Sequence, residues 1–173
     1  MLATQSQLNA ALILFVVCVA IIDLRTHSIP NLLCAVAAIV GLASQLWIHG
    51  DDGLWSALGG AAVGLAVFLP FYVLRAFGAG DVKAMATVGI FLGMHTTMLA
   101  VSMTLIAGAV LGAAMLLLKP AAASATLYRL MALLISPIAS MRGSRQATTQ
   151  SLRFPYGVAI ACGTCAALLV TPR

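Results

Sequence analysis

The sequence contains no glutamate and few charged residues of any kind. Charged side chains make up 8% of its 173 residues, whereas a soluble globular domain carries roughly 25%. Apolar side chains make up 62%. This composition excludes a soluble globular protein and predicts an integral membrane protein, with residues 1–173 forming one membrane domain and no separate soluble domain.

Cysteine is also scarce, and its four positions do not suit a disulfide framework or a zinc site. Cys18 and Cys34 lie in apolar segments, and Cys162 and Cys165 form a CxxC pair inside another. Zinc held by four cysteines needs two such pairs, usually in polar loops. We interpret the cysteines as small residues that pack between helices, and we expect no metal and no cofactor.

Long apolar runs fill most of the chain. A helix needs about 20 apolar residues to cross a bilayer, so the length of the chain allows about six spans. The apolar runs predict helices over residues 8–22, 32–48, 54–74, 84–118 and 155–170. The fourth run is too long for one span, and the polar residues 93–97 divide it in two. The expected fold is an all-α, polytopic membrane bundle with about six transmembrane helices.

The basic residues orient this bundle. With the N-terminus outside, eight of the nine Lys and Arg residues face the cytoplasm, as the positive-inside rule requires. Asp23 and Asp81 then lie on the cytoplasmic side, whereas Asp51 and Asp52 lie outside. His49 and His95 also lie on the outer side, which makes them unsuitable as catalysts for the two cytoplasmic aspartates.

One segment allows two interpretations. Residues 121–141 are apolar enough for a seventh span, but they contain Arg129 and Pro137 and have basic residues on both sides. Basic flanks favour a helix that lies on the membrane surface. We expect residues 119–153 to form a cytoplasmic or interfacial segment, with a seventh span as the alternative.

Two of the four carboxylates stand where apolar runs end. Asp23 closes the first run, and Asp81 follows the glycines Gly78 and Gly80. A charge at a bilayer boundary costs free energy and invites a functional explanation. Two neighbouring carboxylates share a proton, so one can activate water while the other protonates a carbonyl oxygen. This predicts an aspartyl protease with Asp23 and Asp81 as catalytic residues, although a lone aspartate at a helix end is more often a cap.

A resemblance makes this prediction more specific. Asp23 with the following Ile29-Pro30-Asn31, the sequence Gly78-Ala-Gly-Asp-Val-Lys83 and the later Pro155-Tyr156-Gly157 resemble the type IV prepilin peptidase family of GxGD intramembrane aspartyl proteases. The resemblance implies that Asp23 and Asp81 cleave the leader peptide of a prepilin or pseudopilin at the cytoplasmic face of the bacterial inner membrane. We expect the lipid bilayer and the pilus assembly machinery as further partners, and no nucleic acid.

The larger members of that family carry an insertion with two CxxC pairs between the first two helices, and they also N-methylate the pilin. Here only residues 25–31 separate the two apolar runs. The sequence therefore resembles the short, peptidase-only branch associated with tight-adherence pili, which argues against methyltransferase activity.

Further residues around the pair are expected to bind substrate or support the site. They are Gly78, Gly80, Lys83, Pro30, Asn31 and Tyr156. Lys83 has three interpretations: it stabilises a catalytic carboxylate, meets an acidic side chain of the pilin, or anchors the helix at the interface. Tyr156 is expected to donate a hydrogen bond near the site.

Two other functions use the same acids. A transporter would use them as proton or cation sites, but neither aspartate is expected at mid-membrane depth. An inactive scaffold for pilus assembly is the other alternative.

Overall fold

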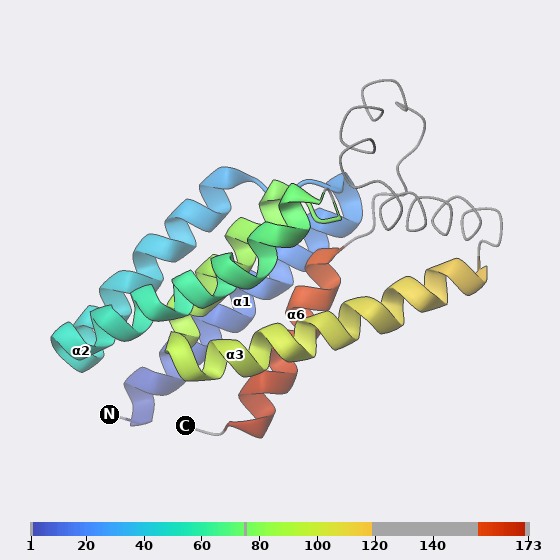
Figure 1. Cartoon of the computed structure of the whole chain (residues 1–173). Helices are drawn as coiled ribbons and strands as arrows, with labels where there is room; N and C mark the ends of the chain where they lie inside the picture. The colour runs from blue at the N-terminus through green and yellow to red at the C-terminus, as the bar shows by residue number, and fades with distance from the viewer. Residues whose placement is uncertain (1, 75, 119–155, 172–173) are drawn as a thin grey trace. The chain divides into compact units, whose positions relative to one another are not determined.

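The computed structural model describes residues 2–74, 76–118 and 156–171, and all regular structure within these ranges is α-helical (Figure 1). The helices are α1 (Leu2–Thr26), α2 (Asn31–Val73), α3 (Ala79–Leu118) and α6 (Tyr156–Val170). The all-α prediction is therefore confirmed for this part of the chain. The expected interfacial segment 119–153 lies outside the described residues.

The chain divides into two compact units. The first contains residues 1–108 and 155–173, and the second contains residues 109–154. The first unit therefore holds α1, α2, α6 and most of α3, and the described part of the second is the helical stretch 109–118. The grouping of residues 1–173 into a single domain stays a prediction.

Glycines break both long helices. The backbone of Gly50 in α2 has φ 62° and ψ −144°, and that of Gly93 in α3 has φ 71° and ψ 172°. Both lie in the left-handed half of the map, which glycine adopts without steric cost. Figure 1 shows that each helix changes direction along its length. The expected breaks after residue 48 and at 93–97 are thus confirmed.

The break at Gly93 leaves backbone carbonyl groups without their helical partners, and buried side chains bind them. The amide Nε2 of Gln45 donates to the carbonyl oxygen of Phe91 at 2.8 Å and to that of Ile90 at 3.4 Å. The hydroxyl of Thr97 donates to the carbonyl oxygen of Gly93 at 2.6 Å. Unpaired backbone groups in an apolar environment cost several kcal/mol each. These contacts allow a helix to end inside the bundle.

Small residues bring α2 and α3 close together. A Cβ atom at Gly60 would overlap the carbonyl oxygen of Gly89, and one at Gly89 would overlap that of Gly60. We call the two parts of each broken helix its first and second arm, so that Gly60 lies on the second arm of α2 and Gly89 on the first arm of α3. On the first arm of α2, a Cβ at Gly41 would lie 2.9 Å from the side chains of Ile90 and Phe91. The first arm of α3 therefore packs against both arms of α2, as small residues permit in membrane bundles.

Helix α6 packs along α1 and against the second arm of α3. A Cβ at Gly163 would overlap the backbone of Thr104, so these two helices also approach closely. The first turn of α6 lies beside the last turn of α1, where the amide of Gly157 contacts Asp23. This packing brings the C-terminal helix to the end of the bundle that carries the candidate site.

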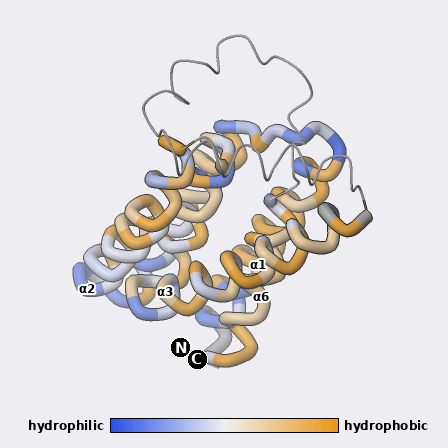
Figure 2. Tube along the Cα trace, turned by 45° about the vertical axis from the view of Figure 1, so that its right-hand side comes forward, coloured by the Kyte–Doolittle hydropathy of each residue, from blue (hydrophilic) through white to orange (hydrophobic). Residues whose placement is uncertain are grey.

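The outer surface is strongly apolar. Leu14, Ile39 and Trp47 are among many large hydrophobic side chains that are more than 60% exposed. Figure 2 shows hydrophobic residues along the helices and hydrophilic residues mainly near their ends. Three helices, α1, α2 and α3, are long and apolar enough to cross a membrane, and α6 is a shorter apolar helix. These features are those of a membrane protein.

Candidate active site

Four helix ends meet where the candidate residues lie, and we call this region the site end. Helix α1 finishes in a left-handed turn: His27 has φ 48°, and its N–H donates to the carbonyl oxygen of Asp23 at 2.9 Å. Pro30 precedes α2 with an extended backbone, φ −64° and ψ 131°. The link between α1 and α2 is therefore short, and it holds the start of α2 near Asp23.

Asp23 lies in the last turn of α1. The sequence predicted that this helix ends at residue 22, directly before Asp23. Its side chain is only 5% exposed, and its Oδ2 accepts a hydrogen bond of 2.7 Å from the backbone N–H of Gly157. A Cβ at Gly157 would lie 2.8 Å from the Cβ of Asp23. Glycine is required at position 157 because α6 approaches the carboxylate directly.

Asp81 lies in the first turn of α3 and is 9% exposed. Its Oδ2 accepts a hydrogen bond of 2.9 Å from the backbone N–H of Gly78, while its own N–H donates to the carbonyl oxygen of Gly78 at 3.1 Å. This reciprocal pattern is a helix cap. It extends α3 to Ala79, five residues before the predicted start, and it engages only one oxygen of the carboxylate.

The two carboxylates are close enough for the charge of Asp23 to act on Asp81. Each accepts one hydrogen bond from a glycine N–H through Oδ2, and no described residue donates to either Oδ1. Like charges this close disfavour double ionisation, so the pair favours a shared proton. Within the described part of the chain, the backbone therefore engages one oxygen of each acid.

An aromatic cluster lies at the site end. The ring of Phe77 lies 4.2 Å from that of Tyr156 and is stacked on Phe71 at 4.9 Å, and Phe68 contacts both Phe77 and Tyr156. Phe68 and Tyr156 are buried. The charge of Asp81 reaches Tyr156, so the cluster lies near this acid.

The ring of Tyr156 fits against α3 because residue 108 of that helix is a glycine. A Cβ at Gly108 would lie 2.6 Å from the Tyr156 hydroxyl oxygen. A larger residue at position 108 would displace the Tyr156 ring from its place near Asp81. Tyr156 thus lies at the site, as predicted, although its expected role as a donor stays a prediction.

The remaining predicted supporting residues also gather here. The Nζ of Lys83 donates a hydrogen bond of 2.8 Å to Oδ1 of Asn31, and both side chains are exposed. Gly80 lies against the link between α1 and α2, where a Cβ would be 3.0 Å from the Cβ of Ile29. Pro30 stands between these two contacts in sequence. The structure therefore brings all the predicted residues to one place, while their functional roles stay predictions.

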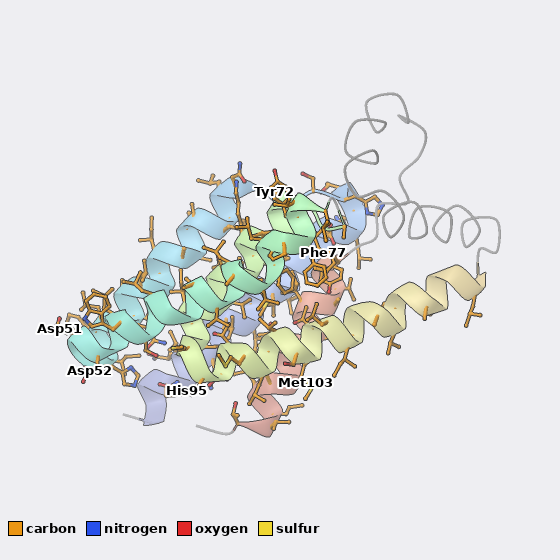
Figure 3. All side chains as sticks on the ribbon, in the orientation of Figure 1. Asp51, Asp52, Tyr72, Phe77, His95 and Met103 are labelled. Carbon is orange, nitrogen blue, oxygen red and sulfur yellow. The ribbon has the colours of Figure 1, made fainter. Side chains whose placement is uncertain are left out.

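The other end of the first unit, which we call the far end, carries the remaining acids. Asp51 and Asp52 are exposed beside the turn of α2, and Figure 3 shows them near His95 and well away from Phe77. The ring of His49 pairs with Gln45, Nδ1 to Oε1 at 3.1 Å. His49 and His95 thus lie away from the site, as expected.

Sequence reasoning missed several residues that build the site. It placed Gly157 in a family motif without a role, and it gave no role to the phenylalanines Phe68 and Phe77. The glycine after a proline and an aromatic residue was the available signal for a close approach at position 157. The aromatic cluster had no comparable signal, because Phe68, Phe71 and Phe77 are joined there by Tyr156, which is remote from them in the sequence.

The described residues contain no group of three or more His, Cys, Asp or Glu side chains that could hold a metal ion. Cys18, Cys34, Cys162 and Cys165 are free thiols. The ionisable side chains that the structure brings to the site include the two carboxylates, Lys83 and Tyr156.

Comparison with known proteins gives one match. The model of the type IV leader peptidase family matches residues 10–113, a range that includes Asp23, Asp81 and the glycine loop. Neither the curated proteins nor the solved structures gave a match. The match covers more than half of the chain and agrees with the resemblance found in the sequence. The chain therefore belongs to the type IV leader peptidase family.

Proposed function

We propose that the protein is an aspartic endopeptidase that uses Asp23 and Asp81 to remove the leader of tight-adherence prepilins. Family membership implies a peptidase with a prepilin substrate. The observation that carries the aspartic assignment is the pairing of two buried carboxylates from different helices, each of which accepts a backbone N–H of a described glycine.

The geometry suits hydrolysis of a peptide bond. With one proton shared, the ionised acid removes a proton from water, and the water oxygen attacks the carbonyl carbon of the scissile bond. The protonated acid donates to the carbonyl oxygen as the tetrahedral intermediate forms. A proton then passes to the leaving amine, and the C–N bond breaks. These reaction steps require one oxygen of each acid to be accessible, and no described residue donates a hydrogen bond to Oδ1 of either acid.

The membrane setting follows from the helix breaks and the charges. Division of α2 at Gly50 and of α3 at Gly93 yields, with α1 and α6, six helical segments for a multi-pass inner-membrane protein. Eight of nine basic residues fall on the side of Asp23 and Asp81 in this topology, which favours a cytoplasmic active site.

Topology is testable by cysteine labelling in a cysteine-free background. An impermeant thiol reagent applied to intact cells should label Asp51→Cys at the far end and leave Ser28→Cys at the site end unlabelled. The reverse pattern would invert the orientation.

The short connection between α1 and α2 favours the peptidase-only branch. Only residues 27–30 lie between these helices, so no domain with paired CxxC motifs stands there. This is the basis for proposing tight-adherence prepilins as substrates and for expecting cleavage without N-methylation.

The decisive test uses the purified protein and a candidate tight-adherence prepilin. Mass spectrometry should find one cleavage between the leader and the apolar helix, an unmethylated new N-terminus, and no loss of activity with a chelator, because carboxylates activate the water. A transporter or an inactive scaffold would leave the prepilin uncut, and inhibition by the chelator would contradict the aspartic mechanism.

A further inference from the structure

Two segments at the site end are joined side by side by three contacts. Lys83 donates to Asn31 at 2.8 Å, and Gly80 packs on Ile29. One turn further into α3, the hydroxyl of Thr87 donates to the carbonyl oxygen of Cys34 at 3.4 Å. The contacts run in register along residues 29–34 and 80–87.

Each segment is connected along the chain to one of the two acids. Asp81 lies within the second segment. Asp23 lies in the last turn of α1, which the short link 27–30 joins to the first segment, and its carbonyl oxygen accepts the N–H of His27 in that link. The separation between the segments therefore influences the separation between the carboxylates.

Among the three contacts, the Lys83–Asn31 hydrogen bond is the strongest polar one. It is short, and its donor is charged. A charged donor or acceptor makes a hydrogen bond roughly twice as strong as one between neutral groups. The Thr87–Cys34 bond is near the limit of hydrogen-bond length, and Thr87 bonds more closely to its own helix, to the carbonyl oxygen of Lys83 at 2.9 Å.

We propose that the hydrogen bond between Lys83 and Asn31 is a tether that sets the separation of Asp23 and Asp81. Both residues are positioning residues in this role, because neither carries out the chemistry. The inference rests on the proposed function and adds to it a reason for a lysine two residues after a catalytic acid.

Two other roles for Lys83 make different predictions. A lysine that acts only through its charge, or one that binds an acidic side chain of the substrate, does not need Asn31. A tether needs both partners equally, so removal of either should have the same effect and removal of both should add nothing.

The experiment measures prepilin cleavage by the purified protein for Asn31→Ala, Lys83→Met, the double variant and Lys83→Arg. Because both side chains are exposed and solvent screens the bond, each single variant should lower kcat by no more than roughly 10-fold, with KM nearly unchanged. The double variant should be no slower than the singles. Lys83→Arg keeps a charged donor and should restore most of the rate.

The pH profile separates positioning from a general loss of structure. Among the described residues, the charge of Asp81 reaches Tyr156, and that of Asp23 reaches Asp81. Asn31→Ala alters none of these three groups and leaves the charge of Lys83 in place. If it lets the carboxylates separate, their mutual repulsion weakens, and the two limbs of the bell-shaped pH–rate profile should move closer together.

Several results would overturn the tether. They are additive losses in the double variant, a raised KM for Lys83→Met beside an unaffected Asn31→Ala, and an unchanged profile in Asn31→Ala. Asp51→Asn is the matched control and should behave as the wild type. If the tether variants stay fully active while Asp81→Asn is inactive, the tether is wrong and the aspartic mechanism stands.

Discussion

The two ends of the helical bundle carry the same kind of acid in opposite circumstances. Asp23 and Asp81 at the site end are buried, and each accepts a backbone N–H. Asp51 and Asp52 at the far end are exposed, and no hydrogen bond to them occurs among the described residues. A buried carboxylate is costly unless it is paired or hydrogen-bonded. The comparison shows that partners and burial, rather than residue type, distinguish the candidate catalysts.

The far end has a polar cluster of its own, formed by Gln45 and His49, and this cluster has a structural role. Gln45 is 3% exposed, binds two carbonyl groups at the end of the first arm of α3, and pairs with His49. These groups complete backbone hydrogen bonding at the helix break. The polar residues of the far end thus serve the fold, while those of the site end are arranged around two acids.

The largest expected effect comes from neutralising either site-end acid. Asp23→Asn and Asp81→Asn should each lower prepilin cleavage by roughly 10²–10⁴-fold, the usual contribution of general acid–base catalysis, because an amide cannot share the proton. Membrane insertion should be retained. The measurement is the size shift of a co-expressed prepilin.

The matched controls are Asp51→Asn and Asp52→Asn at the far end, which should cleave at the wild-type rate. Full processing by a site-end variant, or an equal loss in a far-end variant, would remove the functional distinction between the two ends.

A smaller loss is expected when the contact between α6 and Asp23 is crowded. Gly157→Ala places a methyl group 2.8 Å from the Cβ of Asp23, so the carboxylate must move. Overpacking of this kind costs about 1–3 kcal/mol, and we expect a cleavage rate lowered roughly 10- to 100-fold.

Gly112→Ala is the control for this substitution, since a Cβ there meets no atom of the described residues within 4 Å. Cleavage and thermal unfolding should be measured for both variants. A wild-type rate in Gly157→Ala would mean that α6 does not position Asp23.

Much of this arrangement was predictable because its causes are local. The glycines at positions 50 and 93 stand among polar residues that interrupt apolar runs, and the two acids stand where such runs end. Gly157 and Asp23 are 134 residues apart, and Gln45 binds the carbonyl groups of residues that follow it by 45 and 46 positions. Such contacts depend on tertiary packing, which no spacing rule specifies. The early start of α3 was missed because the helix bounds were taken from the apolar runs, and the run that follows Asp81 and Lys83 begins only at residue 84.

At the far end, Gln45 should matter for stability alone. Gln45→Leu leaves buried carbonyl groups unpaired and should lower the free energy of unfolding by about 1–3 kcal/mol, with a normal cleavage rate below the unfolding temperature. Gln7→Leu, at an exposed position of α1, is the matched control and should be nearly neutral. A rate defect in Gln45→Leu at full folding would couple the far end to catalysis.

The smallest effect should come from His49. His49→Ala removes one partly buried hydrogen bond to Gln45, which contributes about 0.5–1.5 kcal/mol, while the bonds from Gln45 to the α3 carbonyl groups remain. Histidine titrates near neutral pH, so a histidine that took part in the chemistry would shape the pH–rate profile. Because His49 lies at the far end, the profile of His49→Ala should overlay that of the wild type, and only the unfolding temperature should fall slightly. A displaced limb in that profile would place a third titrating group in the mechanism and contradict the assignment of the chemistry to the two aspartates.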